Sequence, residues 1–445
     1  MTPALPRPVA RRDASRGVAA LTVVMVLFFV MAMVAAYTNR NLLFEQRISA
    51  NSYRATRALE AADAGVEWTL AMLNGGRITA DCTRPLAAGA AGLTDFRSRY
   101  LTPSASEAFG EGAFDLAWGQ VQANRVYPVC VVSNATTRCT CPTLGDADNF
   151  AVTADEANSS TFRITFRLFN DDTPRGGAIQ FVTRGCANPG SGNTACIRQT
   201  DDQPGVDSAT ALITTVGLVR ALPVAPKAVL TAGTTVSAAS PGGLQVANGD
   251  FASGLTVHAG TSVTASAGSR FESAAGGGGD GRIDSDAALR DLSNQGADIW
   301  FRAQFVQDPA GYRRQPAAVL LNCAAGCNGA AIADALLLNP RNPIWAEGDV
   351  NLNAAGALGS AADPAMLIVN GTLTISGDVQ ATGFVHAEQI RWSAPATASW
   401  DGALVSRTSF DASSLARLTY NKAALDVIRL RYGSFVRAPG GWNLF

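Results

Sequence analysis

Lysine and histidine are almost absent from this sequence. Among its 35 lysines and arginines only Lys227 and Lys422 are lysines, and the two histidines, His258 and His386, lie far apart. The net charge of −1 over 445 residues lacks the positive excess typical of nucleic-acid-binding domains, so we expect no nucleic-acid partner. An isolated histidine beside valine in a strand is usually a packing or surface residue. We therefore expect neither histidine to be catalytic.

The common catalytic motifs are missing as well. The sequence has no GxSxG elbow, no HExxH pair and no GxxxxGK phosphate loop, the signatures of many hydrolases, zinc peptidases and nucleoside triphosphatases. We predict a protein that is not an enzyme and needs no cofactor. Asp280, Asp284 and Asp286 follow a glycine run and are weak candidates for calcium ligands, but their spacing does not fit an EF-hand. Solvated loop acids are the simpler interpretation.

The N-terminus carries one long apolar run, Val18–Tyr37, which has no charged residue. About twenty such residues are enough to cross a bilayer as a helix. Four arginines precede the run against a single acid, so the positive-inside rule keeps residues 1–17 in the cytoplasm. A secretory signal is cleaved after its apolar core, whereas Gly17 lies before this one. We expect cleavage after Gly17, which leaves the apolar run in the mature chain.

The helical pattern continues past the membrane. Between Val18 and Leu73 there is no proline and a single glycine, Gly65. Apolar residues recur at three- and four-residue steps along one face: Phe44, Ile48, Ala55, Leu59, Ala62, Val66, Leu70 and Leu73. Asn74, Gly75 and Gly76 supply a stop. One helix over residues 18–74 is predicted, with about 84 Å between Val18 and Leu73 at 1.5 Å per residue.

The stretch Leu42–Trp68 contains Glu45, Arg47, Asn51 and the run LEAADAG at 59–65. With these residues it resembles the helix of PilX-type minor pilins of type IV pili. The resemblance implies that prepilin peptidase cleaves after Gly17 and methylates the amine of Val18. It also implies a single-pass precursor in the inner membrane with a periplasmic head, which later joins a pilus fibre or its tip. Other minor pilins, the major pilin and a tip adhesin are the implied partners.

One position departs from the pilin pattern. Pilin families usually place glutamate at the fifth mature position, where it neutralises the terminal amine of a neighbour; here that position is Thr22. A buried carboxylate without a partner is costly, so a subunit with no neighbour above it is better off without one. Thr22 thus favours a minor subunit near the fibre tip.

Eight cysteines all follow the membrane segment, which indicates disulfides in an oxidising compartment. Cys186 and Cys196 bracket one short loop, and Cys323 and Cys327 bracket another. The remaining four allow three connectivities, which the sequence leaves open: Cys82, Cys130, Cys139 and Cys141. A zinc site is the weaker interpretation, because no second ligand pair lies at the required spacing.

Two β-rich regions follow the helix. Residues 77–225 predict a pilin-like head, because Phe162–Leu168 alternates between apolar and polar residues as a half-buried antiparallel strand does. In residues 226–445 small turn residues separate apolar residues at six-residue steps, which indicates β-solenoid coils. These steps are Phe251, Val257 and Val263, and then Leu367, Leu373, Val379 and Val385. We expect solenoid pieces at 228–270 and 345–408, an inserted segment 271–344 with helices at 286–305 and 330–338, and a C-terminal helix at 421–432.

The predicted fold class is therefore α+β: a long N-terminal transmembrane and assembly helix, an antiparallel head and a C-terminal solenoid-like region. Segments of 344–385 and the ending Pro439–Phe445 resemble the C-terminal half of long PilX-like proteins. Two other functions compete with a minor pilin. The large tip pseudopilin of type II secretion shares part of the helix motif. A membrane-anchored β-helical carbohydrate-active protein is a third, weaker alternative, for which Asp349, Asp378 and Asp401 would be the acids.

Overall fold

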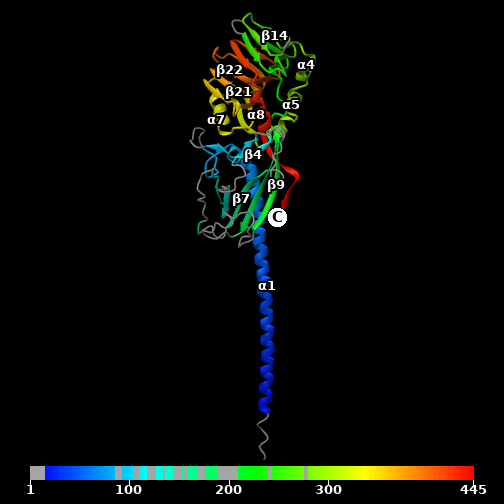
Figure 1. Ribbon diagram of the computed structural model, residues 1–445, viewed down its shortest axis with the longest axis vertical. Coiled ribbons are helices and arrows are strands. Elements are labelled where there is room, and N and C mark those ends of the chain that lie inside the picture. Colours follow the sequence, from blue (N-terminus) through cyan, green and yellow to red (C-terminus); the bar gives the residue numbers. More distant parts are fainter. Residues whose placement is uncertain are drawn as a thin grey trace, which may run out of the picture.

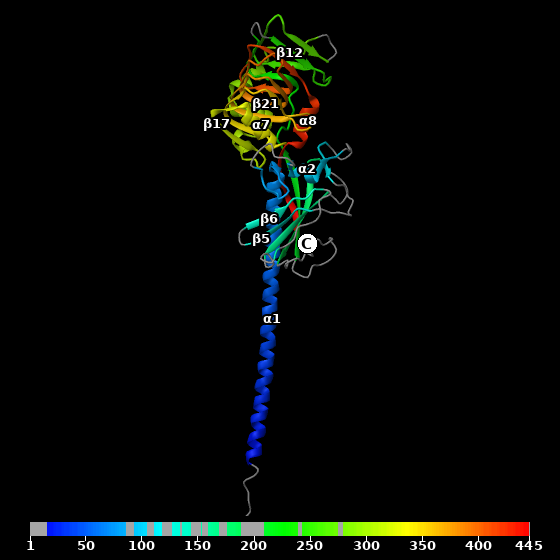
Figure 2. The same ribbon diagram turned by 90° about the vertical axis from the view of Figure 1, so that its left-hand side faces the viewer.

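The computed structural model describes residues 16–85, 93–104, 111–117, 127–133, 136–143, 153, 159–168, 176–187, 209–238, 243–274 and 279–444. Three parts follow one another along its long axis: a protruding helix, an antiparallel sheet and a stack of parallel strands (Figure 1). The view at 90° shows the same order (Figure 2). Residues 1–15 of the predicted leader lie outside the described residues.

Helix α1 (Arg16–Leu73) is continuous over 58 residues, as the lack of proline predicts. It ends where the Asn74 amide donates to the Leu70 carbonyl at 3.1 Å and Gly75 turns the chain. Its C-terminal third packs against strands of the head, while the rest extends away from the molecule (Figure 1). The long apolar helix is thus confirmed.

The head is built on a six-stranded antiparallel sheet with the order β25-β9-β8-β7-β5-β6. Its strands are β5 (Val129–Ser133), β6 (Thr136–Thr140), β7 (Ser160–Arg167), β8 (Ala178–Ala187), β9 (Ala209–Arg220) and β25 (Gly433–Leu444). Small elements cover one end: β1 (Arg77–Ile78), β2 (Thr94–Asp95), α2 (Phe96–Tyr100), β3 (Leu101–Pro103) and β4 (Phe114–Leu116). As the alternation predicts, Phe162 and Ile164 of β7 are buried in the core between the sheet and α1.

Strand β25 comes from the other end of the chain. It pairs with β9 in a register that joins Gly433 to Arg220 and Leu444 to Leu212. The solenoid is therefore inserted between two neighbouring strands of the head sheet. The sequence pattern instead places all of residues 226–445 in the solenoid-like region, because the partner of β25 lies more than 200 residues earlier and leaves no local trace.

The third part is a curled parallel sheet of 15 strands. They are β10 (Ala228–Ala232), β11 (Thr235–Ala238), β12 (Gly243–Asn248), β13 (Leu255–Ala259), β14 (Ser262–Ala265), β15 (Arg270–Ser273), β16 (Arg282–Ile283), β17 (Val319–Asn328), β18 (Ile344–Leu352), β19 (Gly356–Leu358), β20 (Ala365–Ile375), β21 (Val379–Trp392), β22 (Ser399–Ser406), β23 (Phe410–Ala412) and β24 (Leu415–Thr419). Parallel pairing between successive coils confirms the predicted solenoid-like region.

The order of the coils differs from their order in sequence. Along one face the strands stack as β17-β18-β20-β21-β22-β10-β13-β16, so the second sequence piece lies beneath the first. The chain enters at β10, climbs to β16, descends through α4 (Ala287–Asn294), α5 (Ala297–Phe305) and α6 (Pro309–Arg313), and restarts at β17. Strands β15, β16 and β17 thus use residues of the segment 271–344 that the sequence assigns to an insertion. Helices α7 (Gly329–Leu338) and α8 (Lys422–Arg431) lie where the pattern predicts.

Six-residue steps mark the solenoid core in the second piece. Leu367, Leu373, Val379 and Val385 are all buried, whereas Phe251 of the first piece is 80% exposed and does not fit the six-residue pattern. Phe251 lies in a turn before β13 and not in a strand. Glycine is needed where coils turn: Gly402 has φ +146°, and a Cβ there would overlap the Gly383 carbonyl of the coil below.

Candidate functional site

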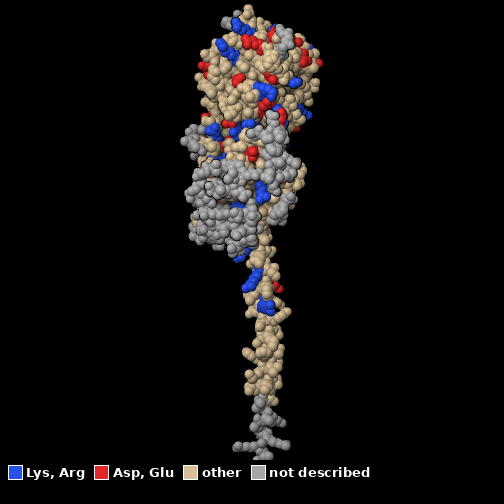
Figure 3. All heavy atoms as spheres, in the orientation of Figure 1, with Lys and Arg blue, Asp and Glu red and all other residues tan. Residues whose placement is uncertain are grey.

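Most of α1 has no cover from its own chain. Residues 19–56, here called the rod, are all exposed and span about 57 Å at 1.5 Å per residue. The rod is apolar up to Tyr37, and its first charges appear beyond that point (Figure 3). Within the described residues this is the helix that is long and apolar enough to cross a membrane. Phe28 is 74% exposed and Met31 69%. A contiguous apolar surface of this size needs lipid or another chain to cover it.

The predicted processing position lies at the beginning of α1. The helix starts at Arg16, so Gly17 and Val18 belong to its first turn. Thr22, the fifth residue after the predicted cut, donates its hydroxyl to the Ala19 carbonyl at 2.9 Å. A polar group in an apolar environment has to be satisfied internally, and this bond does so without a charge.

The three remaining residues of the helix motif stay apart. Glu45, Arg47 and Asn51 are exposed on the rod, and in the described part of the chain none of them forms an ion pair or side-chain hydrogen bond. Residues two apart on a helix point to different sides, so Glu45 and Arg47 do not face one another. Their charges are thus available to a neighbouring chain.

Glycine lets α1 approach the head sheet closely. A Cβ at Gly185 of β8 would stand closer than 3 Å to three backbone atoms of Ala58 and Ala62. On the helix side, Gly65 faces Thr183 and Phe162 with no room for a Cβ. The head sheet therefore packs closely on the backbone of α1 just beyond the rod. Gly65 is the single glycine of the predicted helix.

A buried arginine joins the C-terminal end of α1 to the other two parts. The Arg97 guanidinium is 2% exposed and donates to the carbonyls of Leu73, at the end of α1, Arg431, at the end of α8, and Gly433, at the start of β25. A cation at two helix C-termini is favourable. Burial nevertheless lowers the pKa of Arg97 to about 10. The helix and motif patterns in the sequence do not single out Arg97, because its partners are backbone carbonyls far away in the chain.

Further bonds join the end of α1 to the head and the head to the solenoid. Asn74 exchanges hydrogen bonds with the Phe435 backbone at 2.8 and 2.9 Å, and Asn342 donates to the Asn74 carbonyl at 3.0 Å. Arg341 lies 3.6 Å from Asp95 of the head. Rod, head and solenoid therefore form one connected body, in which a force on one part reaches the others.

Disulfides brace the head and the lowest solenoid coil. Cys82 pairs with Cys141 and Cys130 with Cys139, which settles the connectivity that the sequence left open. The predicted pair Cys323–Cys327 is present in β17. Cys186 is also disulfide-bonded, but its predicted partner Cys196 lies outside the described residues.

The weak calcium candidates Asp280 and Asp286 are bonded to side chains of the protein. Asp280 receives a hydrogen bond from Arg282 at 2.5 Å, and Asp286 lies 2.7 Å from His258 Nε2. Asp286 also caps α4, and these bonds lower its pKa, with the His258 bond as the largest cause. Among the described residues no three His, Cys, Asp or Glu side chains gather as a metal site would need.

Comparison with known proteins agrees with the N-terminal pattern. Residues 16–67 match the family model described as PilX N-terminal. No curated protein matches the chain. Among solved structures, the competence-associated pilin ComZ from Thermus thermophilus aligns over 88% of this chain and 98% of its own, with 11% identity and a TM-score of 0.21, which is too low to carry weight. The matched segment covers the rod and most of its continuation onto the head, so the N-terminal helix of this chain is similar to that of PilX proteins.

Proposed function

We propose that the chain is a minor pilin of a type IV pilus, which takes part in priming fibre assembly and belongs to a complex at the tip. The observation that carries this proposal is the rod: about 57 Å of exposed helix, apolar in its first half, joined firmly to a folded head. A simple membrane anchor needs only the apolar half. The polar continuation through Glu45, Arg47 and Asn51 would give each subunit specific contacts with its neighbours in a fibre.

Two features favour a place at the tip. Thr22 carries no charge that would need the amine of a subunit above it. The solenoid extends the head along the direction of the rod, at the end farthest from the membrane segment (Figure 2). In a fibre of stacked rods it would occupy the space of the next heads, and the tip is where no further head follows.

The expected course of events uses no covalent chemistry after maturation. Prepilin peptidase cleaves after Gly17 and methylates Val18, and the precursor waits in the inner membrane with its head in the periplasm. The rod then exchanges lipid for the rods of other minor pilins and the major pilin. The exposed solenoid is left to contact an adhesin or an external surface.

A replacement of the membrane segment tests this proposal. In the full chain, Val18–Tyr37 is exchanged for an unrelated single-span helix of equal length, and sheared surface fibres are counted and probed for the chain. We expect the variant to stay in the membrane, to be absent from fibres and to reduce fibre number. Thr22→Ser, which keeps the hydroxyl, is the matched control and should assemble normally. Normal fibres that contain the exchanged chain would refute the proposal.

A further inference from the structure

The lowest strand of the solenoid has one edge without a partner. Within the described residues β17 pairs with β18 alone, in an unbroken register from Val319 to Cys323. The Val319 amide donates to the Pro343 carbonyl at 3.0 Å, which lies on the β18 side. Backbone groups alternate in direction along a strand, so those of Leu320 and Asn322 point to the free edge. A row of such groups can pair with a strand of another chain.

The free edges at the other end of the stack are protected, and that of β17 is not. Strands β14, β15 and β16 have four, four and two residues, and the last two carry Arg270, Glu272 and Arg282. Strand β17 has ten residues, with no charge and no proline. Its bulge at the Cys323–Cys327 disulfide begins only after the first five residues. Short length, charge and proline are common means by which proteins prevent edge pairing.

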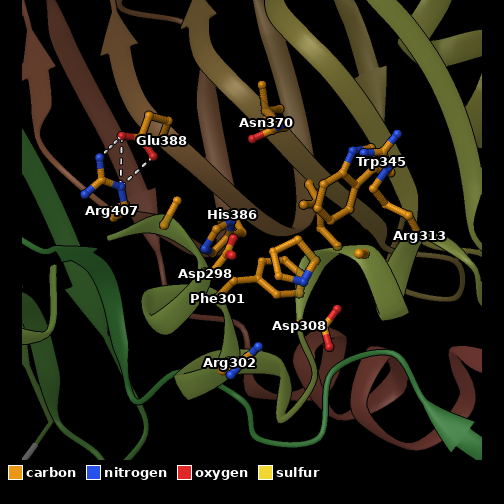
Figure 4. Close-up of a pocket in the computed structure, with 15 residues that line it drawn as sticks. Asp298, Phe301, Arg302, Asp308, Arg313, Trp345, Asn370, His386, Glu388 and Arg407 are labelled. Atoms are coloured by element: carbon orange, nitrogen blue, oxygen red, sulfur yellow. Dashed lines mark hydrogen bonds and ion pairs between the residues drawn. The ribbon is translucent and has the colours of Figure 1, made fainter. Parts of the chain in front are cut away.

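Leu320 is left uncovered on the outer face of this edge. It lies below Trp345, Ile368 and His386 in one ladder of the parallel sheet. Helices α5 and α6 cover these three residues around a cavity of about 350 Å³ and leave them at most 7% exposed (Figure 4). Leu320, by contrast, is 52% exposed. The ladder therefore ends in an apolar side chain that its own chain does not bury.

The surface around β17 carries almost no charge. Between Gln315 and Asn339 the one charged residue is Asp334, although 16% of the whole chain is charged. This segment forms β17 and α7, which pack against one another, and Ala331 and Leu337 of α7 are exposed like Leu320. Depletion of charge distinguishes the core of a protein interface from other surface. The surface thus fits a protein partner that is itself uncharged at the contact.

The place of β17 indicates which partner can reach it. The Ala317 amide, just before the strand, donates to Ser434 Oγ of β25 at 3.0 Å, and the Leu338 carbonyl of α7 packs on Gly76 beyond the end of α1. Strand β17 therefore belongs to the coil nearest the head (Figure 2). Its free edge faces the rod end of the molecule, away from the distal coils. A subunit packed along the rod would bring its own head to this edge.

We propose that the free edge of β17 binds an uncharged extended segment of a neighbouring pilin subunit, which adds one strand to the solenoid. The backbone groups of Leu320 and Asn322 supply the hydrogen bonds, and the Leu320 side chain supplies apolar contact. This inference rests on the proposed function, because the neighbour is a subunit of the same fibre.

Photo-crosslinking in intact fibres tests the contact. Benzoylphenylalanine is placed at position 320 of the full chain or, as the control, at position 251. Phe251 is also an exposed apolar residue, but it precedes β13 near the far end of the stack. Fibres are irradiated and sheared, and the linked peptides are identified by mass spectrometry. We expect position 320 to link to a segment of another pilin and position 251 to link to none.

A charge at the edge tests whether the contact matters for assembly. Leu320→Lys should lower the amount of the chain in fibres about tenfold at an unchanged level in membranes, whereas Phe251→Lys should enter fibres as the parent does. If Leu320→Lys is lost from membranes, the cross-link decides alone. The inference is overturned when the parent enters fibres but position 320 links to no pilin, or when Leu320→Lys enters them normally. A parent chain that is absent from fibres overturns the proposed function, and this inference with it.

Discussion

Acid should weaken the solenoid through His386. Burial and the nearby Arg407 lower the pKa of this histidine from 6.5 to about 3 in the folded chain. The unfolded chain therefore takes up a proton near pH 6.5, while the folded chain does not until about pH 3. Since stability rises with pH wherever the unfolded state binds more protons, the stabilising effect of neutral pH is lost progressively between these two values.

The size of this loss follows from the shift. One pKa unit corresponds to about 1.4 kcal/mol, so the free energy of unfolding should fall by about 2 kcal/mol between pH 7 and pH 5 from this residue alone. Near pH 3 the loss approaches about 5 kcal/mol. The cavity beside the ring is lined by the charged residues Asp298, Arg302, Glu388 and Arg407. Desolvation by burial is the largest cause of the pKa shift of His386, and the positive charge of Arg407 is the second.

Urea unfolding at pH 7 and pH 5 measures the effect. Tryptophan emission reports on this region, because Trp300, Trp392 and Trp400 are fully buried in the solenoid and its covering helices. His386→Phe should abolish about 2 kcal/mol of the pH dependence, whereas His258→Gln, at a partly exposed ring, should retain it. If His386→Phe and the parent chain lose the same stability on acidification, the reasoning about a neutral buried ring is refuted.

Three other changes test the packing. Gly185→Ala should cost about 2 kcal/mol, since the new methyl group meets the backbone of α1; Gly217→Ala on the next strand has nothing within 4 Å and should be neutral in a thermal melt. Arg97→Met should cost about 3 kcal/mol by leaving backbone carbonyls unpaired, and should increase proteolysis between head and solenoid. Removing Cys82–Cys141 as a double alanine variant should cost about 4 kcal/mol in urea unfolding, since the bond closes a loop of 59 residues.

Each of these has a clear opposite result. Equal melting temperatures of the two glycine variants would mean that α1 does not pack closely on the sheet. An Arg97→Met protein as stable and protease-resistant as the parent would show that the three parts are joined by other contacts. A double cysteine variant of unchanged stability would contradict the proposed bracing of the head.

The sequence predicts the features that are local. Helix α1 follows from an unbroken apolar and then amphipathic pattern, and the solenoid core of the second piece follows from the six-residue steps through Leu367 and Val385. Short disulfide loops such as Cys323–Cys327 are equally local. In each case the residues that make the structure are close together in the chain.

What the sequence does not predict depends on distant partners. The return of β25 to β9, the stacking of the second solenoid piece beneath the first and the bond of Arg97 to Gly433 all join residues more than 170 positions apart. The two histidines illustrate the same limit. His386 and His258 occupy one ladder of the parallel sheet, since His386 pairs with Val405 and His258 with Thr231 of the strand next to it. Their surroundings differ because of the covering helices. Helix α5 buries His386 against Phe301 and Phe305, whereas Asp286 at the start of α4 bonds to His258.

The central claim is that the apolar rod is retained in the mature protein and passes from membrane to fibre. N-terminal mass spectrometry of the chain, taken both from inner membranes and from sheared surface fibres, tests it most directly. The account predicts a methylated Val18 as the first residue in both samples. A first residue downstream of Tyr37, or a chain that is found in membranes and never in fibres, would contradict it.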